Sequence, residues 1–142
     1  MRISDDDGLE RTLDADTIAV VGCSTTPGKA AHGVPAYLQR HGYRVVPVNP
    51  FADEILEETT YDSLAGVPDS IDIGVIDVFR PSEEAGGIVD AAIERAERVG
   101  DVSAVWLQLD ITDAGAGERA AEAGLDFVQD RCLKVEHQRL RG

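Results

Sequence analysis

Runs of apolar residues alternate with helix-spaced apolar residues along this chain. Mainly apolar runs, most of them nearly continuous, occur at 17–21, 43–48, 71–79, 102–109 and 125–128, a pattern typical of strands buried on both faces of a sheet. Between them, apolar residues follow the i, i+3, i+4 spacing of helices, most clearly after Ser82, at Ala85, Ile88, Val89, Ala92, Ile93 and Ala96. Further helices are expected over 34–39 and 112–123. The alternation predicts an α/β fold with a five-stranded, mainly parallel sheet between two layers of helices.

The loop after the first predicted strand has features of an anion-binding site. Gly22 ends the apolar run, and Pro27, Gly28 and Lys29 follow before the first predicted helix. A loop of this kind directs free backbone N–H groups toward a ligand at a helix N-terminus, where a phosphate is favoured. We therefore expect a phosphate-bearing ligand here, and an exposed loop lysine without a ligand is the alternative.

The loop matches neither of two common nucleotide motifs. A dinucleotide loop GxGxxG would need glycine at positions where the chain has Ser24 and Pro27. The second strand ends in Val48-Asn49-Pro50, without the acid that holds a ribose, so NAD is disfavoured. The Walker motif GxxxxGK[ST] would need one residue fewer before the lysine and a hydroxyl at Ala30, so an NTPase is disfavoured too.

Several ordered blocks do point to one family. The chain reads GCSTTPGKAAHGVPAYLQRHGYRVVPVNP, then DVFRP, AVWLQL and DRCLKVEH. These blocks resemble the small stand-alone CoA-binding proteins, whose Rossmann-like domain is similar to the CoA-binding domain of the succinyl-CoA synthetase α subunit. The resemblance implies a single Rossmann-like domain over 17–142, preceded by an acidic segment at 1–16. It also implies coenzyme A or an acyl-CoA as the ligand.

The resemblance and the loop chemistry together predict the cofactor-binding residues. The loop is suited to binding the phosphates of CoA. The end of the second strand is suited to binding the adenosine, and the end of the third strand is suited to binding the pantetheine arm or a phosphate. Plain strand packing is the alternative for the two valines, and an ion pair with Glu83 or Glu84 is the alternative for the arginine. The predicted set is Gly22, Ser24, Thr25, Pro27, Gly28, Lys29, Val48, Asn49, Pro50, Val78, Phe79, Arg80 and Gln108.

No catalytic constellation is evident in the sequence. Cys132 and His137 are neighbours in the chain, but a thiol needs a base within hydrogen-bond reach, so the segment 130–137 is interpreted as a structural turn. We therefore predict non-catalytic CoA binding. A CoA-dependent enzyme or redox protein using Cys132 or Cys23 is the alternative. The cysteines and histidines have no metal-ligand spacing, so no metal is predicted.

Composition narrows the classes of partner. The net charge is −14, with 27 acidic and 13 basic residues, which disfavours nucleic acid. No apolar run is long enough to span a membrane and no leader is recognised, so a cytoplasmic protein is expected. The acidic surface and the presence of only two lysines favour adaptation to high salt over an ordinary acidic surface. Assembly into a homo-oligomer stays open.

Overall fold

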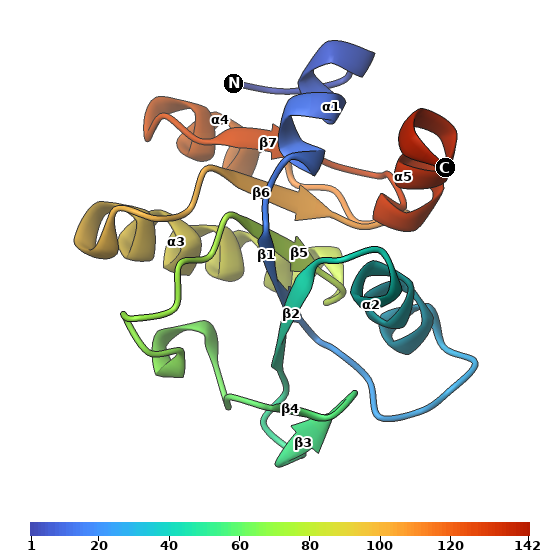
Figure 1. Cartoon of the computed structure of the whole chain (residues 1–142). Helices are drawn as coiled ribbons and strands as arrows, with labels where there is room; N and C mark the ends of the chain where they lie inside the picture. The colour runs from blue at the N-terminus through green and yellow to red at the C-terminus, as the bar shows by residue number, and fades with distance from the viewer.

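A computed structural model describes residues 1–142, and a five-stranded parallel sheet lies at its centre (Figure 1). The spatial order of the strands is β2-β1-β5-β6-β7, and every neighbouring pair is parallel. β1 has the bounds of its predicted run, and the other four strands are shorter than the apolar runs that predicted them. Their bounds are Thr17–Val21 (β1), Arg44–Val48 (β2), Val75–Val78 (β5), Ala104–Leu107 (β6) and Asp126–Val128 (β7). The predicted α/β fold is confirmed.

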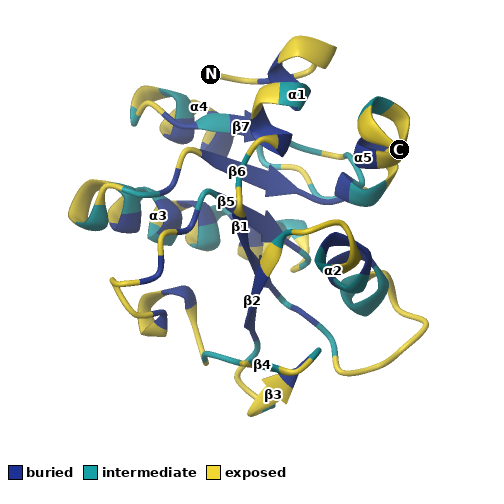
Figure 2. Cartoon of the chain, viewed as in Figure 1, coloured by how far each residue is buried: buried dark blue, intermediate teal, exposed yellow.

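Helices cover both faces of the sheet, and each face has its own apolar cluster. One face packs against α1 (Asp6–Leu13), α2 (Ala30–Arg40) and α5 (Leu133–Arg141), and the other against α3 (Ser82–Val99) and α4 (Ala114–Glu122). Buried residues fill the strands and the helix faces that meet them, while exposed residues lie on the outer helix faces (Figure 2). The three predicted layers are therefore present.

Three local predictions need correction. The segment 130–137 is not only a turn, because α5 begins within it at Leu133. The first helix after the glycine loop begins at Ala30 rather than Val34, and the helix expected over 112–123 begins only at Ala114, with Asp113 as its cap. A small hairpin of β3 (Glu54–Ile55) and β4 (Glu58–Thr59) follows β2, with the short 3₁₀ turn η1 (Leu64–Gly66) after it.

The N-terminal residues pack onto the edge of the sheet. The Ile3 amide donates to the Phe127 carbonyl at 2.8 Å, which extends the sheet beyond β7. Leu9 and Leu13 of α1 are buried in the cluster that α1 shares with α2 and α5. Three ion pairs then join α1 and its end to α5: Arg139 with Asp6, and Arg141 with Glu10 and Asp14.

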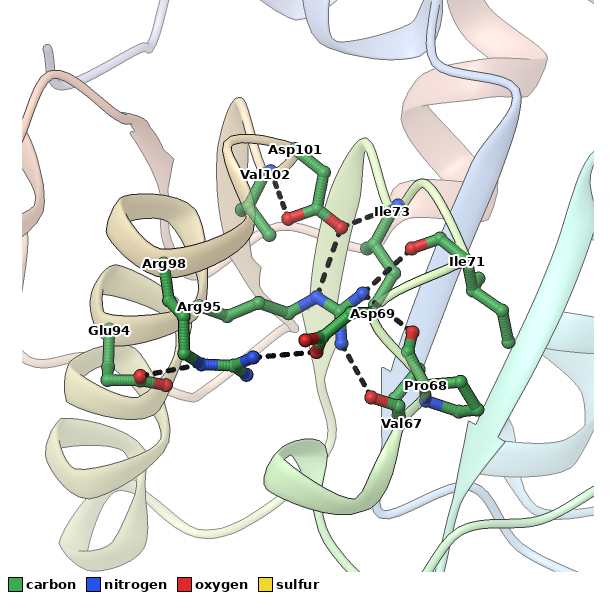
Figure 3. A network of polar contacts seen from close by, with 10 residues as sticks. All are labelled: Val67, Pro68, Asp69, Ile71, Ile73, Glu94, Arg95, Arg98, Asp101 and Val102. Carbon is green, nitrogen blue, oxygen red and sulfur yellow. Dashed lines mark hydrogen bonds and ion pairs between the residues drawn. The ribbon is translucent and has the colours of Figure 1, made fainter.

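A buried arginine fixes the loop that leads into β5 (Figure 3). The Arg95 guanidinium of α3 pairs with Asp101 at 3.0 Å and donates to the carbonyls of Val67, Pro68 and Ile71. Asp101 also accepts from the amides of Ile73 and Val102. Because every charge here has hydrogen-bond partners, the cluster is structural: it holds the segment 67–73 against α3.

Candidate functional site

The loop between β1 and α2 turns at a position that requires glycine. Gly22 has φ +88, and a Cβ at this position would lie 2.9 Å from Cδ of Arg80. Its amide donates to the Val48 carbonyl at 3.0 Å, so the loop starts tied to the end of β2. Gly28 also has a positive φ, of +97, just before α2 begins. The backbone conformation of this loop therefore favours glycine at both positions, Gly22 and Gly28.

Some amides of this loop hold it together and others remain free. The Ser24 amide donates to the Ala31 carbonyl at 2.9 Å, and the Thr26 amide to the Ser24 hydroxyl at 3.0 Å. By contrast, the amides of Thr25 and Gly28 and the first two amides of α2 donate no hydrogen bond within the chain. These four free donors lie in one stretch, exposed except for the half-buried Ala31, that also contains Lys29. Several free N–H groups and one cation therefore lie close together, an arrangement that suits an anion.

The end of β2 is braced against this loop through Asn49. Its side-chain amide donates to the Cys23 carbonyl at 2.9 Å, and its side-chain oxygen accepts from the Phe51 amide at 2.7 Å. Asn49 therefore positions the turn that contains the exposed Pro50 and Phe51. The Phe51 ring is 94% exposed. Sequence reasoning did not select this residue, although an aromatic residue directly after Asn-Pro at a strand end was a usable signal.

The other predicted residues, in or just after β2, β5 and β6, differ in how deeply they are buried. Val48 and Val78 are buried in the sheet, as the packing alternative requires. Arg80 is exposed and pairs with Glu84 at 2.7 Å, the ion pair named as the alternative to ligand binding. Gln108 is buried, and its side-chain oxygen accepts from the Leu133 amide at the start of α5. Phe79 is half-buried against the α2 side of the sheet.

The two cysteines have different environments. Cys23 is fully buried, and burial raises the pKa of its thiol to about 12, with a further contribution from the nearby Asp77 carboxyl. Such a thiol is a poor nucleophile. Cys132 is half-buried and lines a pocket of about 550 Å³ at the carboxyl ends of β6 and β7. That pocket contains none of the predicted cofactor-binding residues.

His137 is not a base for Cys132. Its Nδ1 lies 2.6 Å from the Tyr37 hydroxyl, and its ring packs edge-on against Tyr37 and His41. Burial lowers the pKa of this imidazole. The histidine therefore serves the contact between α2 and α5. The structure also holds no group of His, Cys, Asp and Glu side chains arranged to bind a metal ion. No helix has the length and apolar character that crossing a bilayer requires.

Comparison with known proteins identifies the family. Residues 16–138 match the family described as "CoA binding domain". The chain belongs to this family. The match includes the β1–α2 loop, the end of β2 and the start of α5, and it covers all five strands of the sheet.

Three relatives show that similar sequences occur in chains of different lengths. "Uncharacterized protein YneT" of Bacillus subtilis is 35% identical over 120 residues, 84% of each chain. The solved "hypothetical protein from Pyrococcus horikoshii OT3" is 36% identical with a TM-score of 0.87, covering 99% of this chain and 94% of that one. "Acetate--CoA ligase [ADP-forming] II" of Archaeoglobus fulgidus is 39% identical over 64 residues, 44% of this chain but 10% of the ligase. The domain therefore occurs both in chains of this size and within much longer ligases.

Proposed function

We propose that this chain binds coenzyme A or an acyl-CoA at the β1–α2 loop and catalyses no reaction of its own. The observation that carries the proposal is the set of free amides beside Lys29 in a chain of the CoA-binding domain family. CoA has a pyrophosphate and a 3′-phosphate, and backbone N–H groups at a helix N-terminus are suited to such groups. Lys29 supplies a point charge for them.

The adenosine would lie over the end of β2. Asn49, Pro50 and Phe51 form an exposed turn directly beside the loop, and the Phe51 ring offers a flat apolar face to a base. Val78 and Val48 would support this surface from beneath, and Arg80 would have to exchange Glu84 for a ligand phosphate to take part. The pantetheine arm would then follow the carboxyl edge of the sheet toward Gln108.

The absence of a base–nucleophile pair supports a binding role. The Cys23 thiol is buried with a raised pKa, and the His137 imidazole is engaged by Tyr37. A CoA-dependent reaction through Cys132 is the second candidate, favoured by the position of this thiol in a pocket. Turnover that is lost in Cys132→Ala but kept in Cys23→Ala would support the second candidate over pure binding.

Calorimetry with matched ligands and variants tests the binding site. We expect CoA to bind more tightly than dephospho-CoA, ATP or NAD, because only CoA has both the 3′-phosphate and the pantetheine arm. Lys29→Ala should weaken CoA binding about tenfold, since a charge-assisted contact is lost. Lys134→Ala removes the only other lysine, which lies over the Tyr37 ring, and should leave the affinity unchanged. Equal affinity for all four ligands would contradict the proposal.

A further inference from the structure

The pocket beside Cys132 is built from segments that lie far apart in the sequence. Its apolar walls come from the N-terminal segment, the ends of β6 and β7 and the first turn of α5. They consist of Ile3, Leu109, Phe127, Cys132 and Val135. Leu109 and Val135 are 60% and 53% exposed, so two large apolar side chains face solvent at one pocket. A volume of about 550 Å³ is within the ordinary range of small-molecule sites.

The charged groups around this pocket are already hydrogen-bonded within the chain. Arg131 pairs with Glu136 at 2.9 Å, and Glu136 also pairs with Arg139. The Arg2 guanidinium donates to the Ala114 carbonyl, and the Asp130 carboxylate accepts from the Asp110 amide at 2.8 Å. Five of the eleven lining residues are apolar, and with the charged groups engaged by the chain it is these side chains that are left to contact an uncharged group.

The two turns at the pocket are held together in an uncommon backbone conformation. Asp110 and Asp130 have φ values of 68 and 56, in the left-handed region that non-glycine residues seldom adopt. In addition to the Asp110–Asp130 contact, the Asp130 amide donates to the Ile111 carbonyl at 3.2 Å. The turns after β6 and β7 are thereby fixed to each other, and the pocket between them and α5 is preformed.

The pocket lies within reach of the pantetheine arm of a CoA bound at the loop. β1 and β7 are three strand spacings apart in the sheet, roughly 14 Å at the usual spacing. The pantetheine arm has about as many backbone bonds as four residues, and it therefore extends roughly 14 Å from its phosphate. An arm that starts at the end of β1 and crosses the ends of β5 and β6 delivers its sulfur to this pocket.

We infer that the pocket binds the acyl group of an acyl-CoA, and that the acyl group is short, neutral and apolar. This inference rests on the proposed function and makes it more specific: the ligand is the thioester rather than free CoA. The loop binds the part that all CoA derivatives share, and the pocket distinguishes between them by their acyl groups.

Calorimetry with three ligands tests whether the loop binds the shared part of CoA and the pocket binds the acyl group. Butyryl-CoA should bind about tenfold more tightly than acetyl-CoA, since two more methylenes are buried. Val135→Trp fills the pocket from α5 and should abolish this difference while leaving the affinity for adenosine 3′,5′-bisphosphate unchanged. Glu97→Trp places the same bulk on the exposed face of α3 and should preserve the difference. Equal binding of the two thioesters, or an undiminished difference in Val135→Trp, would overturn the inference.

Protection of Cys132 gives a second readout in the unaltered protein. Cys132 lines the pocket and Cys23 is fully buried, so an alkylating reagent should label one site, which Cys132→Ser would remove. Saturating butyryl-CoA should slow this labelling at least severalfold, whereas saturating adenosine 3′,5′-bisphosphate should not. If both ligands bind and labelling is equally fast with each, the inference fails and the proposed function stands. If no CoA derivative binds, both fail.

Discussion

Asp77 is a buried acid in the middle of β5 that lacks compensating contacts. Its register neighbours are Val20 and Trp106, both in the apolar cluster under α2 and α5, and Cys23 lies nearby. Neither carboxyl oxygen has a hydrogen-bond partner within the chain. Burial therefore raises the pKa of Asp77 well above its usual value of 3.8. At any pH at which the Asp77 carboxyl is ionised in the unfolded chain, its burial makes the folded state less favourable.

The pH dependence of stability should reveal this acid. Between pH 3.8 and the raised pKa, the folded chain keeps the proton that the unfolded chain loses, so Asp77 makes folding less favourable as pH rises. Each pH unit of that window corresponds to about 1.4 kcal/mol. Asp77→Asn should therefore be more stable than the wild type at pH 8 by about 1 kcal/mol or more, and the gap should narrow toward pH 4.

Urea unfolding of both proteins at pH 4, 6 and 8 measures this gap. Other carboxyl groups titrate alike in the two proteins, so their effects cancel in the difference. Asp72→Asn, at an exposed position, serves as the control for loss of one surface charge. A gap that stays constant over the whole range would show that Asp77 has the same protonation state in the folded and unfolded chains.

Phe51 provides the residue-scale test of the adenosine position. Its ring is 94% exposed, while its backbone is held by Asn49, so the side chain is placed but not packed. Stacking on a base contributes about 1–3 kcal/mol. Phe51→Ala should weaken binding of CoA and of adenosine 3′,5′-bisphosphate by about tenfold each, and Phe51→Tyr should restore it. Calorimetry showing an equal loss for 4′-phosphopantetheine, which has no adenine, would place the ring elsewhere on the ligand.

At the scale of elements, the sequence predicted strands better than it predicted α5. The strands are nearly continuous apolar runs because helices cover both faces of the sheet. The buried side of α5 instead contains Glu136 and His137 beside Leu133, and polar residues at buried positions break the apolar spacing. Its cap, Cys132, makes no side-chain hydrogen bond either, so the usual start signal is missing.

The candidate site likewise has one part that the sequence predicted and one part that it did not. The β1–α2 loop was predictable because glycine, proline and lysine follow one another within a single segment. The pocket was not predictable, because Ile3, Leu109 and Val135 meet only after the sheet has formed and the N-terminal segment has joined β7. No local sequence pattern indicates that these three residues come into contact.

Two arginines on α3 allow buried and exposed ion pairs to be compared within one helix. Arg95 is 1% exposed and binds Asp101 and three carbonyls, whereas Arg98 binds Asp69 and Glu94 at the surface (Figure 3). Arg95→Gln leaves the Asp101 carboxylate buried without its cation, which costs about 3–5 kcal/mol. Arg98→Gln should cost much less, because solvent screens ion pairs at the surface.

Chemical denaturation of the two variants against the wild type measures both losses. Hydrogen exchange should also show faster exchange at 67–73 in Arg95→Gln, because that segment is fixed by Arg95. Similar losses for both variants would mean that the buried cluster contributes no more than surface pairing. A loss without faster local exchange would mean that Arg95 supports α3 rather than the loop.

At the scale of the whole molecule, charge repulsion opposes folding. The net charge is −14, and most arginines are already used in ion pairs, while most of the 27 acids have no basic partner. Salt screens both the ion pairs and the repulsion. Because unpaired acids outnumber the pairs, repulsion should dominate the response to salt.

The melting temperature should therefore rise with potassium chloride. The screening length falls from about 30 Å at 0.01 M to about 3 Å at 1 M, so repulsion between separate surface carboxylates is removed over that range. Replacing Glu97, Glu118 and Glu122 by glutamine removes three exposed acids that have no ion pair, and this variant should melt higher than the wild type at 0.01 M and gain less from added salt. Thermal melts at matched protein concentration measure both effects. A wild-type melting temperature that falls with salt would mean that the ion pairs joining α1 to α5 outweigh the repulsion, and the acidic surface would then have to be explained without adaptation to high salt.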